Sequence, residues 1–301
     1  MRTSQFILLA LAAASSAALS PAQEIRYTYD ASGRLARADY GNGKAIAYTH
    51  NNAGDLIRRA FETGATAVFT SVSSASFAAG RPLAPGLIAS GFGAGLATGV
   101  LANTQAVLPT SLLGTSVTIV DAAGTTHQAP LFAVAPTQIN YLVPTTAALG
   151  PARITVTSGT GATINGTADI ARTSPGLYTA NLQGSGVASA FALTVNSSGA
   201  QTQALLFNPN TLAPVPVDLN PGEQVFLLLF GTGIRGFQQA VAATVGGESV
   251  PVLGAVAQGQ FAGLDQVNIG PLPESLRGRG ELPIVLRVDG QAANTVTVLI
   301  R

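Results

Sequence analysis

A repeated pattern of polar and apolar residues is the feature that most constrains the fold of this chain. A Gln-Ile-Asn segment that begins at Gln138 recurs as Gln-Val-Asn from Gln266, 128 positions later (266 − 138). A Pro-Gly pair precedes a strand-like run and a glycine-rich turn in both halves, at Pro85 and Pro221, an offset of 136 (221 − 85). The two offsets differ, so the loops between these landmarks differ in length. The sequence predicts a duplicated unit in a chain of 301 residues, which is long enough for two domains.

Each unit has the pattern of a β-sandwich. Short β-branched and aromatic runs alternate with Gly, Pro, Asn and Ser at intervals of about ten residues, and the hydrophobic period within a run is two, as where Val117 and Ile119 flank Thr118. The candidate strands are Ala67–Val72, Leu87–Phe92, Ser116–Val120, Gln138–Val143, Arg153–Thr157, Thr167–Ala171, Ala188–Val195, Ala204–Phe207, Gln224–Phe230, Val241–Val245, Gln266–Ile269, Leu282–Val288 and Thr295–Ile300. We predict an all-β chain with two tandem immunoglobulin-like sandwiches, over residues 65–174 and 175–301.

The chain begins with the features of an export signal. Arg2 precedes an apolar run from Phe6 to Ala14, and small residues stand at Ser20 and Ala22. We expect residues 1–22 to be removed, which intact-mass analysis would show. The run is shorter than the ~20 residues of a spanning helix, so no membrane span is expected in the mature chain. There is no cysteine, hence no disulfide and no lipid attachment. The predicted location is secreted or cell-surface, with the periplasm as the alternative.

Residues 23–64 carry a 21-residue repeat (48 − 27). Alternation places Tyr27 and Tyr29 on one strand face, and the Asp30-Ala31-Ser32-Gly33 turn should lead into a second strand. The two copies run from Tyr27 to Leu35 and from Tyr48 to Leu56, the second with His50, Asn51 and Asp55 in place of Tyr, Asp and Arg. The segment resembles the YD repeats of the RHS family, in which many repeats form a β-shell or bind surface glycans. Fewer than two full units cannot form a shell, so we expect a hairpin arm that packs on the next domain or stays mobile.

Further motifs carry a second resemblance. They are Ala75-Ser76-Phe77, Leu83-Ala84-Pro85-Gly86, Phe92-Gly93, Leu108-Pro109-Thr110-Ser111-Leu112, Pro130-Leu131-Phe132, Gln138-Ile139-Asn140, Pro175-Gly176-Leu177-Tyr178, Gly231-Thr232-Gly233, Gln266-Val267-Asn268 and Asn294-Thr295-Val296-Thr297. With them, residues 73–301 resemble the uncharacterised C-terminal domain of exported proteins from Solibacter-type acidobacteria. Each half is also similar to immunoglobulin-like modules of the IPT/TIG kind. The acidobacterial family has no known activity, and the IPT/TIG resemblance implies a sandwich fold without catalytic residues.

Composition argues against nucleic-acid and cofactor binding. Only 10% of residues are charged and the net charge is +1, so the chain lacks a basic surface. The segment from Gly231 to Gly236 reads G-x-G-x-x-G. A dinucleotide fold needs an acidic residue about 20 positions further on, whereas Glu248 and Asp265 follow at 12 and 29 (248 − 236, 265 − 236). We therefore expect neither nucleic acid nor a cofactor.

The sequence assigns no catalytic or metal-binding residue. The mature chain has two histidines: we expect His50 on a hairpin face and His127 solvated at a turn. The aspartates are scattered singly, which favours turn positions over a calcium site; they are Asp121, Asp169, Asp218, Asp265 and Asp289. Spacing alone neither nominates nor excludes Glu223 and Glu248 as a glycosidase pair. Tyr141 and Tyr178 are expected in the core.

These observations predict a secreted, non-catalytic structural or interaction module whose partner is an extracellular protein or a polysaccharide. The alternative is a carbohydrate-binding or accessory protein of polysaccharide degradation, which exposed aromatics or paired acids at one end of a sandwich would favour. Within the repeated segment, Ile139 and Tyr141 should face the core. Gln138 and Asn140 should lie on the opposite face and hydrogen-bond the backbone of an adjacent irregular segment.

Overall fold

The computed structural model describes residues 25–40, 44–63 and 68–301. These residues form β-strands and one short 3-10 helix, Glu274–Leu276, so the predicted all-β class is confirmed. Among them there is no helix with the length and hydropathy to cross a membrane. The predicted signal peptide, residues 1–22, lies outside the described residues.

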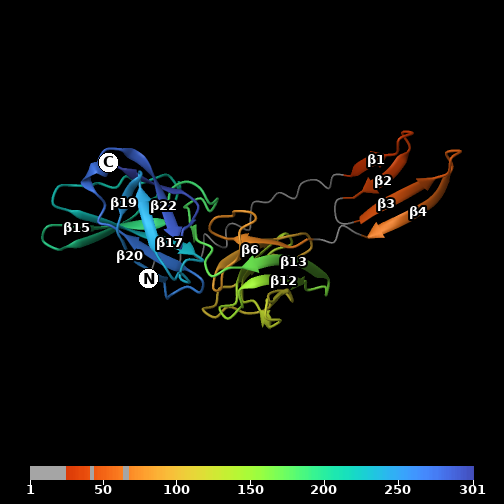
Figure 1. The fold of residues 1–301 in the computed structure, drawn as a ribbon, viewed down its shortest axis with the longest axis horizontal. Helices are drawn as coiled ribbons and strands as arrows, with labels where there is room; N and C mark the ends of the chain where they lie inside the picture. The colour runs from red at the N-terminus through yellow and green to blue at the C-terminus, as the bar shows by residue number, and fades with distance from the viewer. Residues whose placement is uncertain (1–24, 41–43, 64–67) are drawn as a thin grey trace.

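The strands form one four-stranded sheet followed by two pairs of antiparallel sheets (Figure 1). The first sheet, here called the arm, has the order β1-β2-β3-β4 and comprises β1 Arg26–Tyr29, β2 Leu35–Asp39, β3 Lys44–His50 and β4 Leu56–Thr63. It occupies the segment for which hairpins were predicted.

The first sandwich consists of sheets β5-β6-β11-β10-β7 and β13-β12-β8-β9. Their strands are β5 Thr70–Ser73, β6 Ile88–Phe92, β7 Leu101–Ala102, β8 Ser116–Val120, β9 Thr126–Gln128, β10 Leu131–Val134, β11 Gln138–Leu142, β12 Gly150–Thr157 and β13 Thr163–Ile170. Buried side chains from both sheets, such as Tyr141 and Ile154, belong to one hydrophobic core, so the sheets pack face to face.

The second sandwich repeats this arrangement with sheets β16-β15-β17-β21-β20 and β19-β18-β22-β23; β14 pairs with β17, and β24 with β22. Its strands are β14 Gly176–Leu177, β15 Ala190–Val195, β16 Gln201–Leu205, β17 Gln224–Thr232, β18 Val241–Val245, β19 Glu248–Val250, β20 Val252–Ala257, β21 Asp265–Ile269, β22 Gly280–Val288, β23 Gln291–Ala292 and β24 Val296–Ile300. A second core contains Leu227 and Ile284 from its two sheets.

The repeated segments have equivalent strand register in the two sandwiches. Phe92 of β6 pairs with Gln138 of β11, and Phe230 of β17 pairs with Gln266 of β21. Asn140 follows two residues after Gln138. In both units the glutamine Nε2 donates to the oxygen of the asparagine two residues later, at 2.9 Å. Equivalent side chains therefore stand at equivalent places in two separate sheets.

The predicted faces of the repeated segment are also confirmed. Ile139 and Tyr141 are fully buried, as are the matching Val267 and Ile269. Side-chain bonds of the amides run along the strand, from Gln138 Nε2 to Asn140 Oδ1, and across it, where Ser90 Oγ donates to Asn140 Oδ1 at 2.9 Å. The prediction that the amides also bond the backbone of an irregular segment stays a prediction. Asn140 is 3% exposed and Gln138 is half-buried, so this amide pair is largely covered.

The two sandwiches contact each other through a third apolar cluster, which contains Ala75 and Ile88 of the first and Tyr178 and Phe230 of the second. Tyr178 Oη lies 2.7 Å from Ser74 Oγ, and the N–H of Ile88 donates to Thr232 Oγ1 at 2.9 Å. Buried hydrogen bonds and apolar contacts together fix the sandwiches to one another more firmly than a flexible linker would.

Two glycines show how closely the sandwiches approach. A Cβ at Gly263 would lie 2.5 Å from Ile88 Cγ1 and 2.7 Å from Leu142 Cδ1, and its φ is +78°. A Cβ at Gly233 would collide with the carbonyl oxygen of Ser174, in the segment that joins the sandwiches. Glycine is needed at both positions because backbone and side chains of one unit occupy the space beside the other.

Candidate binding surface

The arm is built from two hairpins whose turns are closed in equivalent ways. Asp30 Oδ1 accepts the backbone N–H groups of Ser32 and Arg34 at 2.9 Å, and Arg34 Nε donates to Asp30 Oδ2 at 2.8 Å. One repeat later, Asn51 Oδ1 accepts the N–H of Asp55 at 2.9 Å while Asn51 Nδ2 donates to Asp55 Oδ2 at 3.0 Å. The substitutions between the repeats exchange an ion pair for an amide–carboxylate bond and keep the turn.

The hairpins also share a register shift at the same repeat position, between Thr28 and Tyr29 in the first and between Thr49 and His50 in the second. A β-bulge at one position of each hairpin strengthens the strand twist there. The predicted hairpin repeat is therefore present in both turn chemistry and register.

Residues paired across antiparallel strands point to the same side of a sheet. Tyr27 pairs with Ala38, Ala38 with Ile46, and Ile46 with Phe61, so one row crosses all four strands on a single side. We call this side the aromatic face; by the same register, its residues whose side chains the structure describes are Tyr27, Tyr29, Leu35, Ala38, Ile46, Tyr48, His50, Leu56, Arg59 and Phe61. The opposite side, the polar face, comprises Thr28, Arg37, Ala47, Thr49, Arg58 and Ala60.

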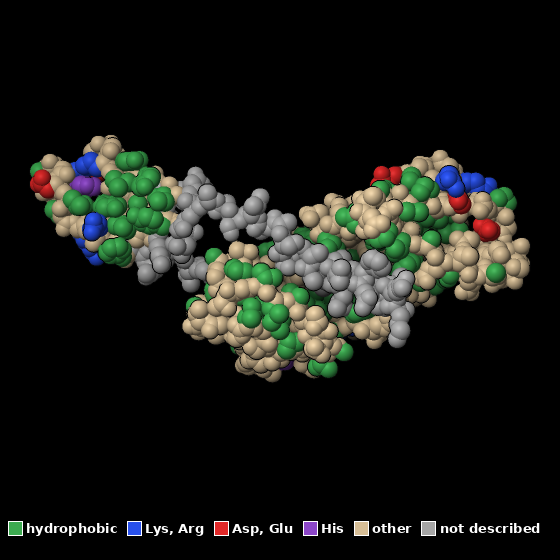
Figure 2. Space-filling view, turned by 180° about the vertical axis from the view of Figure 1, so that it is seen from behind, with side chains coloured by type: hydrophobic (Ala, Val, Ile, Leu, Met, Phe, Trp, Pro, Cys, Tyr) green, Lys and Arg blue, Asp and Glu red, His purple; other side chains and the backbone are tan. Residues whose placement is uncertain are grey.

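The large side chains of the aromatic face are open to solvent. Tyr27 is 53% exposed, Tyr29 62%, Leu56 51% and Phe61 76%. Figure 2 shows hydrophobic side chains gathered over the arm sheet. A sheet with one apolar side gains stability by covering that side with a second layer. Among the described residues, the aromatic face is therefore our candidate surface for binding a partner.

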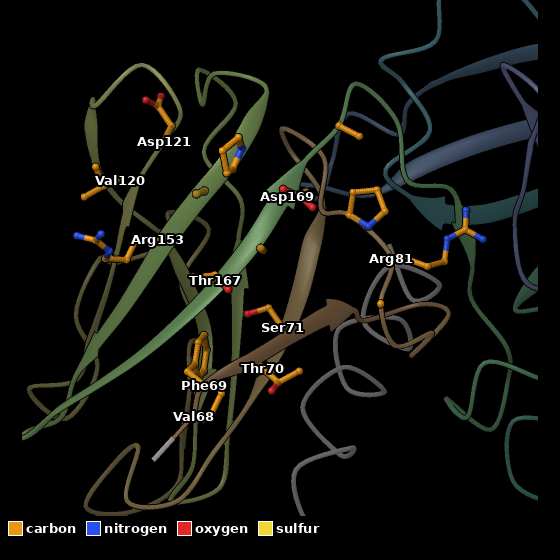
Figure 3. Close-up of a pocket in the computed structure, with 16 residues that line it drawn as sticks. Val68, Phe69, Thr70, Ser71, Arg81, Val120, Asp121, Arg153, Thr167 and Asp169 are labelled. Carbon is orange, nitrogen blue, oxygen red and sulfur yellow. The ribbon is translucent and has the colours of Figure 1, made fainter. Parts of the chain in front are cut away.

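A groove of about 960 Å³ lies on the first sandwich (Figure 3). The outward sides of β12 and β13 line it through Arg153 and Thr167, which pair across the two strands, and residues 68–71 and 80–82 complete it. Asp121 and Arg153 lie at one end and Arg81 at the other. The one aromatic residue in its lining, Phe69, is 1% exposed and supplies no ring on which a sugar could stack.

One carboxylate of this groove, Asp121, is engaged in structure. Asp121 accepts hydrogen bonds from the N–H groups of Ala123, Thr125 and Ala148, and its Oδ2 lies 2.8 Å from His127 Nε2. The Ala148 N–H and the His127 ring are the main causes that lower the pKa of Asp121 to about 2. Asp121 is thus held ionised and does not provide a proton for general acid catalysis near neutral pH.

The expectation of a solvated His127 was wrong. Its side chain is 12% exposed and bonds to Asp121, because the β8–β9 turn begins at Asp121 and brings His127 of β9 back beside it. Within the described residues His127 has no hydroxyl partner, so the Asp–His contact lacks the nucleophile of a catalytic triad. His50 is the last residue of β3 and belongs to the aromatic face, in agreement with the prediction.

The aspartates take several roles. Asp121 and Asp289 sit in turns as predicted, whereas Asp169 and Asp265 belong to strands β13 and β21, and Asp218 pairs with Arg301 at 2.7 Å. The turn assignment was therefore wrong for Asp169 and Asp265, while Asp218 lies in an irregular segment between strands. In the part of the chain that the structure covers, no three acidic or histidine side chains gather into a metal site.

The G-x-G-x-x-G segment is a structural contact. Gly231 and Thr232 end β17, and the following residues lead into no helix. Asp265, fully buried, accepts the N–H of Ile234 at 2.7 Å and lies 2.5 Å from Arg235 Nε. Burial raises the pKa of Asp265, and these hydrogen bonds and the Arg235 charge act against that rise. Arg235 of the motif thus forms an internal ion pair, and Gly233 packs against the linker between the sandwiches.

The remaining candidates are separated or buried. Glu223 lies in the turn before β17. Glu248 is on β19, which belongs to the other sheet of that sandwich, and it contacts Ser275 and Arg279. Tyr141 and Tyr178 are buried as predicted, and burial raises the pKa of both hydroxyls.

Comparisons with known proteins identify no ligand for this surface. No family model matches the chain, and no curated protein matches it. Among solved structures, the chain is similar to Bacteroides ovatus SGBP-B of the mixed-linkage glucan utilization locus, in complex with a mixed-linkage heptasaccharide, at 13% identity and a TM-score of 0.30. The match covers 93% of this chain and 59% of that one. At this TM-score the similarity supports no inference, and the resemblances to the YD-repeat, acidobacterial and IPT/TIG families stay predictions.

Proposed function

We propose that this protein is an exported, non-catalytic interaction module that binds its partner through the aromatic face of the arm. The observation that carries the proposal is the exposure of Tyr27, Tyr29 and Phe61 on one side of a single-layer sheet. Clustered exposed aromatic side chains are typical of interaction sites.

The sandwiches support this proposal because two of their candidate functional groups are engaged in internal contacts. The carboxylate in the groove that lies nearest a histidine, Asp121, is saturated with hydrogen bonds, and the glycine motif is used for packing. Two sandwiches joined by a buried contact give a firm scaffold, and the module attached to them provides the contact surface.

Binding to the isolated envelope of the producing cell tests the proposal. We expect the full chain to be retained, Phe61→Ser to be washed out, and Val107→Ser, which removes an apolar side chain that is 81% exposed on the first sandwich, to be retained. Unchanged melting temperatures would show that the variants are folded. Equal retention of Phe61→Ser, or release of sugars or acids from a glycan and ester panel, would contradict the proposal.

Carbohydrate binding is the second candidate, favoured by the tyrosines and phenylalanine of the same face, whose rings could stack on sugar rings. Competition by soluble polysaccharides separates the two cases. If one polysaccharide releases the bound chain and Phe61→Ser abolishes its binding, the ligand is a glycan. If none competes, the partner is a protein.

A further inference from the structure

We infer that the partner of the aromatic face is the same face of a second copy of this chain. This inference rests on the proposed function, because it names the occupant of the proposed surface. The two copies would stack their arms sheet on sheet, with the aromatic faces inside and the polar faces in solvent.

The extent of the face argues for a sheet as its occupant. It spans all four strands, and aliphatic side chains such as Leu35, Ile46 and Leu56 accompany the aromatic rings. A single extended sugar chain would cover one row and leave the others in water. A second sheet stacked at about 10 Å covers every row at once, as the paired sheets of each sandwich already do in this chain.

The exposed area is sufficient for a dimer. With about 200 Å² for a fully exposed large side chain, Tyr27, Tyr29, Leu56 and Phe61 together offer roughly 450 Å² per copy. Two copies then bury roughly 900 Å² from these residues alone, and the half-buried Ile46 and Tyr48 bring the total to about 1,000 Å², the lower limit for a specific interface.

The face carries few charges, which suits an apolar contact. Among its residues with described side chains, Arg59 is charged, His50 is titratable and none is acidic. A two-fold axis brings the apolar rows of two copies together, and each Arg59 can stack on a tyrosine ring of the other copy. The polar face carries Arg37 and Arg58, which keep the outer side of the stacked arms in water.

The open edge of the second sandwich is the rival place for self-association. β20 ends its sheet and exposes Leu253 by 60% and Val256 by 58%. An exposed edge strand can pair with another chain. It offers two large apolar side chains in a bulged strand, fewer than the arm presents, so we assign the contact to the arm.

The test is the molar mass of the full chain in solution, measured by light scattering over a concentration series. We expect a dimer for the wild type, for Val107→Ser and for Leu253→Ser. For Phe61→Ser we expect a dissociation constant raised about 100-fold, because each dimer loses the two most exposed aromatic side chains of its contact. Tyr29→Ser should weaken the dimer in the same direction. Far-ultraviolet dichroism and thermal melting of each variant show that it is folded. A monomeric wild type at all concentrations, or a dimer broken by Leu253→Ser and not by Phe61→Ser, would overturn the inference.

Envelopes from cells that lack this protein separate the inference from the proposed function. If such envelopes capture the wild type and not Phe61→Ser, the face binds another molecule; the function stands and the inference fails. If a Phe61-dependent dimer forms in solution but no envelope retains either chain, the inference stands and envelope binding fails.

Discussion

The hydrogen bond between Ser74 and Tyr178 makes a specific prediction about how the two sandwiches are joined. Their hydroxyl oxygens lie 2.7 Å apart, and the residues are 6% and 3% exposed. Tyr178→Phe keeps the ring in its apolar cluster and leaves the Ser74 hydroxyl without this partner. A buried hydroxyl that loses its hydrogen bond costs about 1–3 kcal/mol, so we expect the free energy of unfolding to fall by that amount. Ser74→Ala should cost a similar amount, since it leaves the tyrosine hydroxyl unpaired.

The double variant Ser74→Ala/Tyr178→Phe decides whether the two hydroxyls meet. Removing both polar groups leaves no unpaired hydroxyl, so the loss should be smaller than the sum of the two single losses, by about 1 kcal/mol or more. Urea unfolding followed by dichroism measures all four chains. Additive losses would show that the hydroxyls do not interact, and with them the described contact between the sandwiches would be refuted.

Three further predictions concern other parts of the molecule. Gly263→Ala should destabilise the chain by about 2–4 kcal/mol, because the new Cβ meets Ile88 and φ is positive; a melting temperature equal to wild type would refute the close approach. Asp121 has a lowered pKa, so its contribution to stability is full above the unfolded value of about 4 and is lost as pH falls toward about 2; Asp121→Asn should flatten the pH dependence of unfolding in that window, and an unchanged profile would contradict the assignment. Asn140→Ala should cost about 1–3 kcal/mol in urea unfolding, since Gln138 loses its acceptor, and should leave envelope binding unchanged; lost binding with unchanged stability would make the amide a ligand contact.

Sequence alone predicted much of the fold because the period of two is local. Val241–Val245 has the predicted bounds, and β6, β8 and β11 match within a residue at each end. The predicted Thr167–Ala171 instead begins at Thr163, since its first half, Thr-Ile-Asn-Gly, contains one apolar residue and gives no alternation to detect. The short β9, Thr-His-Gln, contains no apolar residue and was missed for the same reason. The edge strand β20, Val-Leu-Gly-Ala-Val-Ala, was missed although it is apolar, because a continuous apolar run shows no period-2 alternation.

The binding surface could be predicted only in part. Alternation placed Tyr27 and Tyr29 on one side, but the row that joins them to Phe61 depends on pairing across four strands, which local spacing does not fix. The role of the glycine motif depended likewise on the linker beside Gly233, a contact between residues far apart in sequence. The environment of His127 was predicted wrongly because its contact with Asp121 depends on the pairing of β8 with β9, which no sequence motif indicates.

Hydroxyl-radical footprinting tests the central claim, that the aromatic face of the arm is the contact surface, most directly. Free and envelope-bound chains are oxidised for the same short time, and modification of each aromatic residue is read by mass spectrometry. We expect Tyr29 and Phe61 to be modified in the free chain at low concentration and protected several-fold when bound, while the buried Tyr141 is unmodified in both states. Equal modification of Tyr29 and Phe61 in the free and bound chains would contradict the claim.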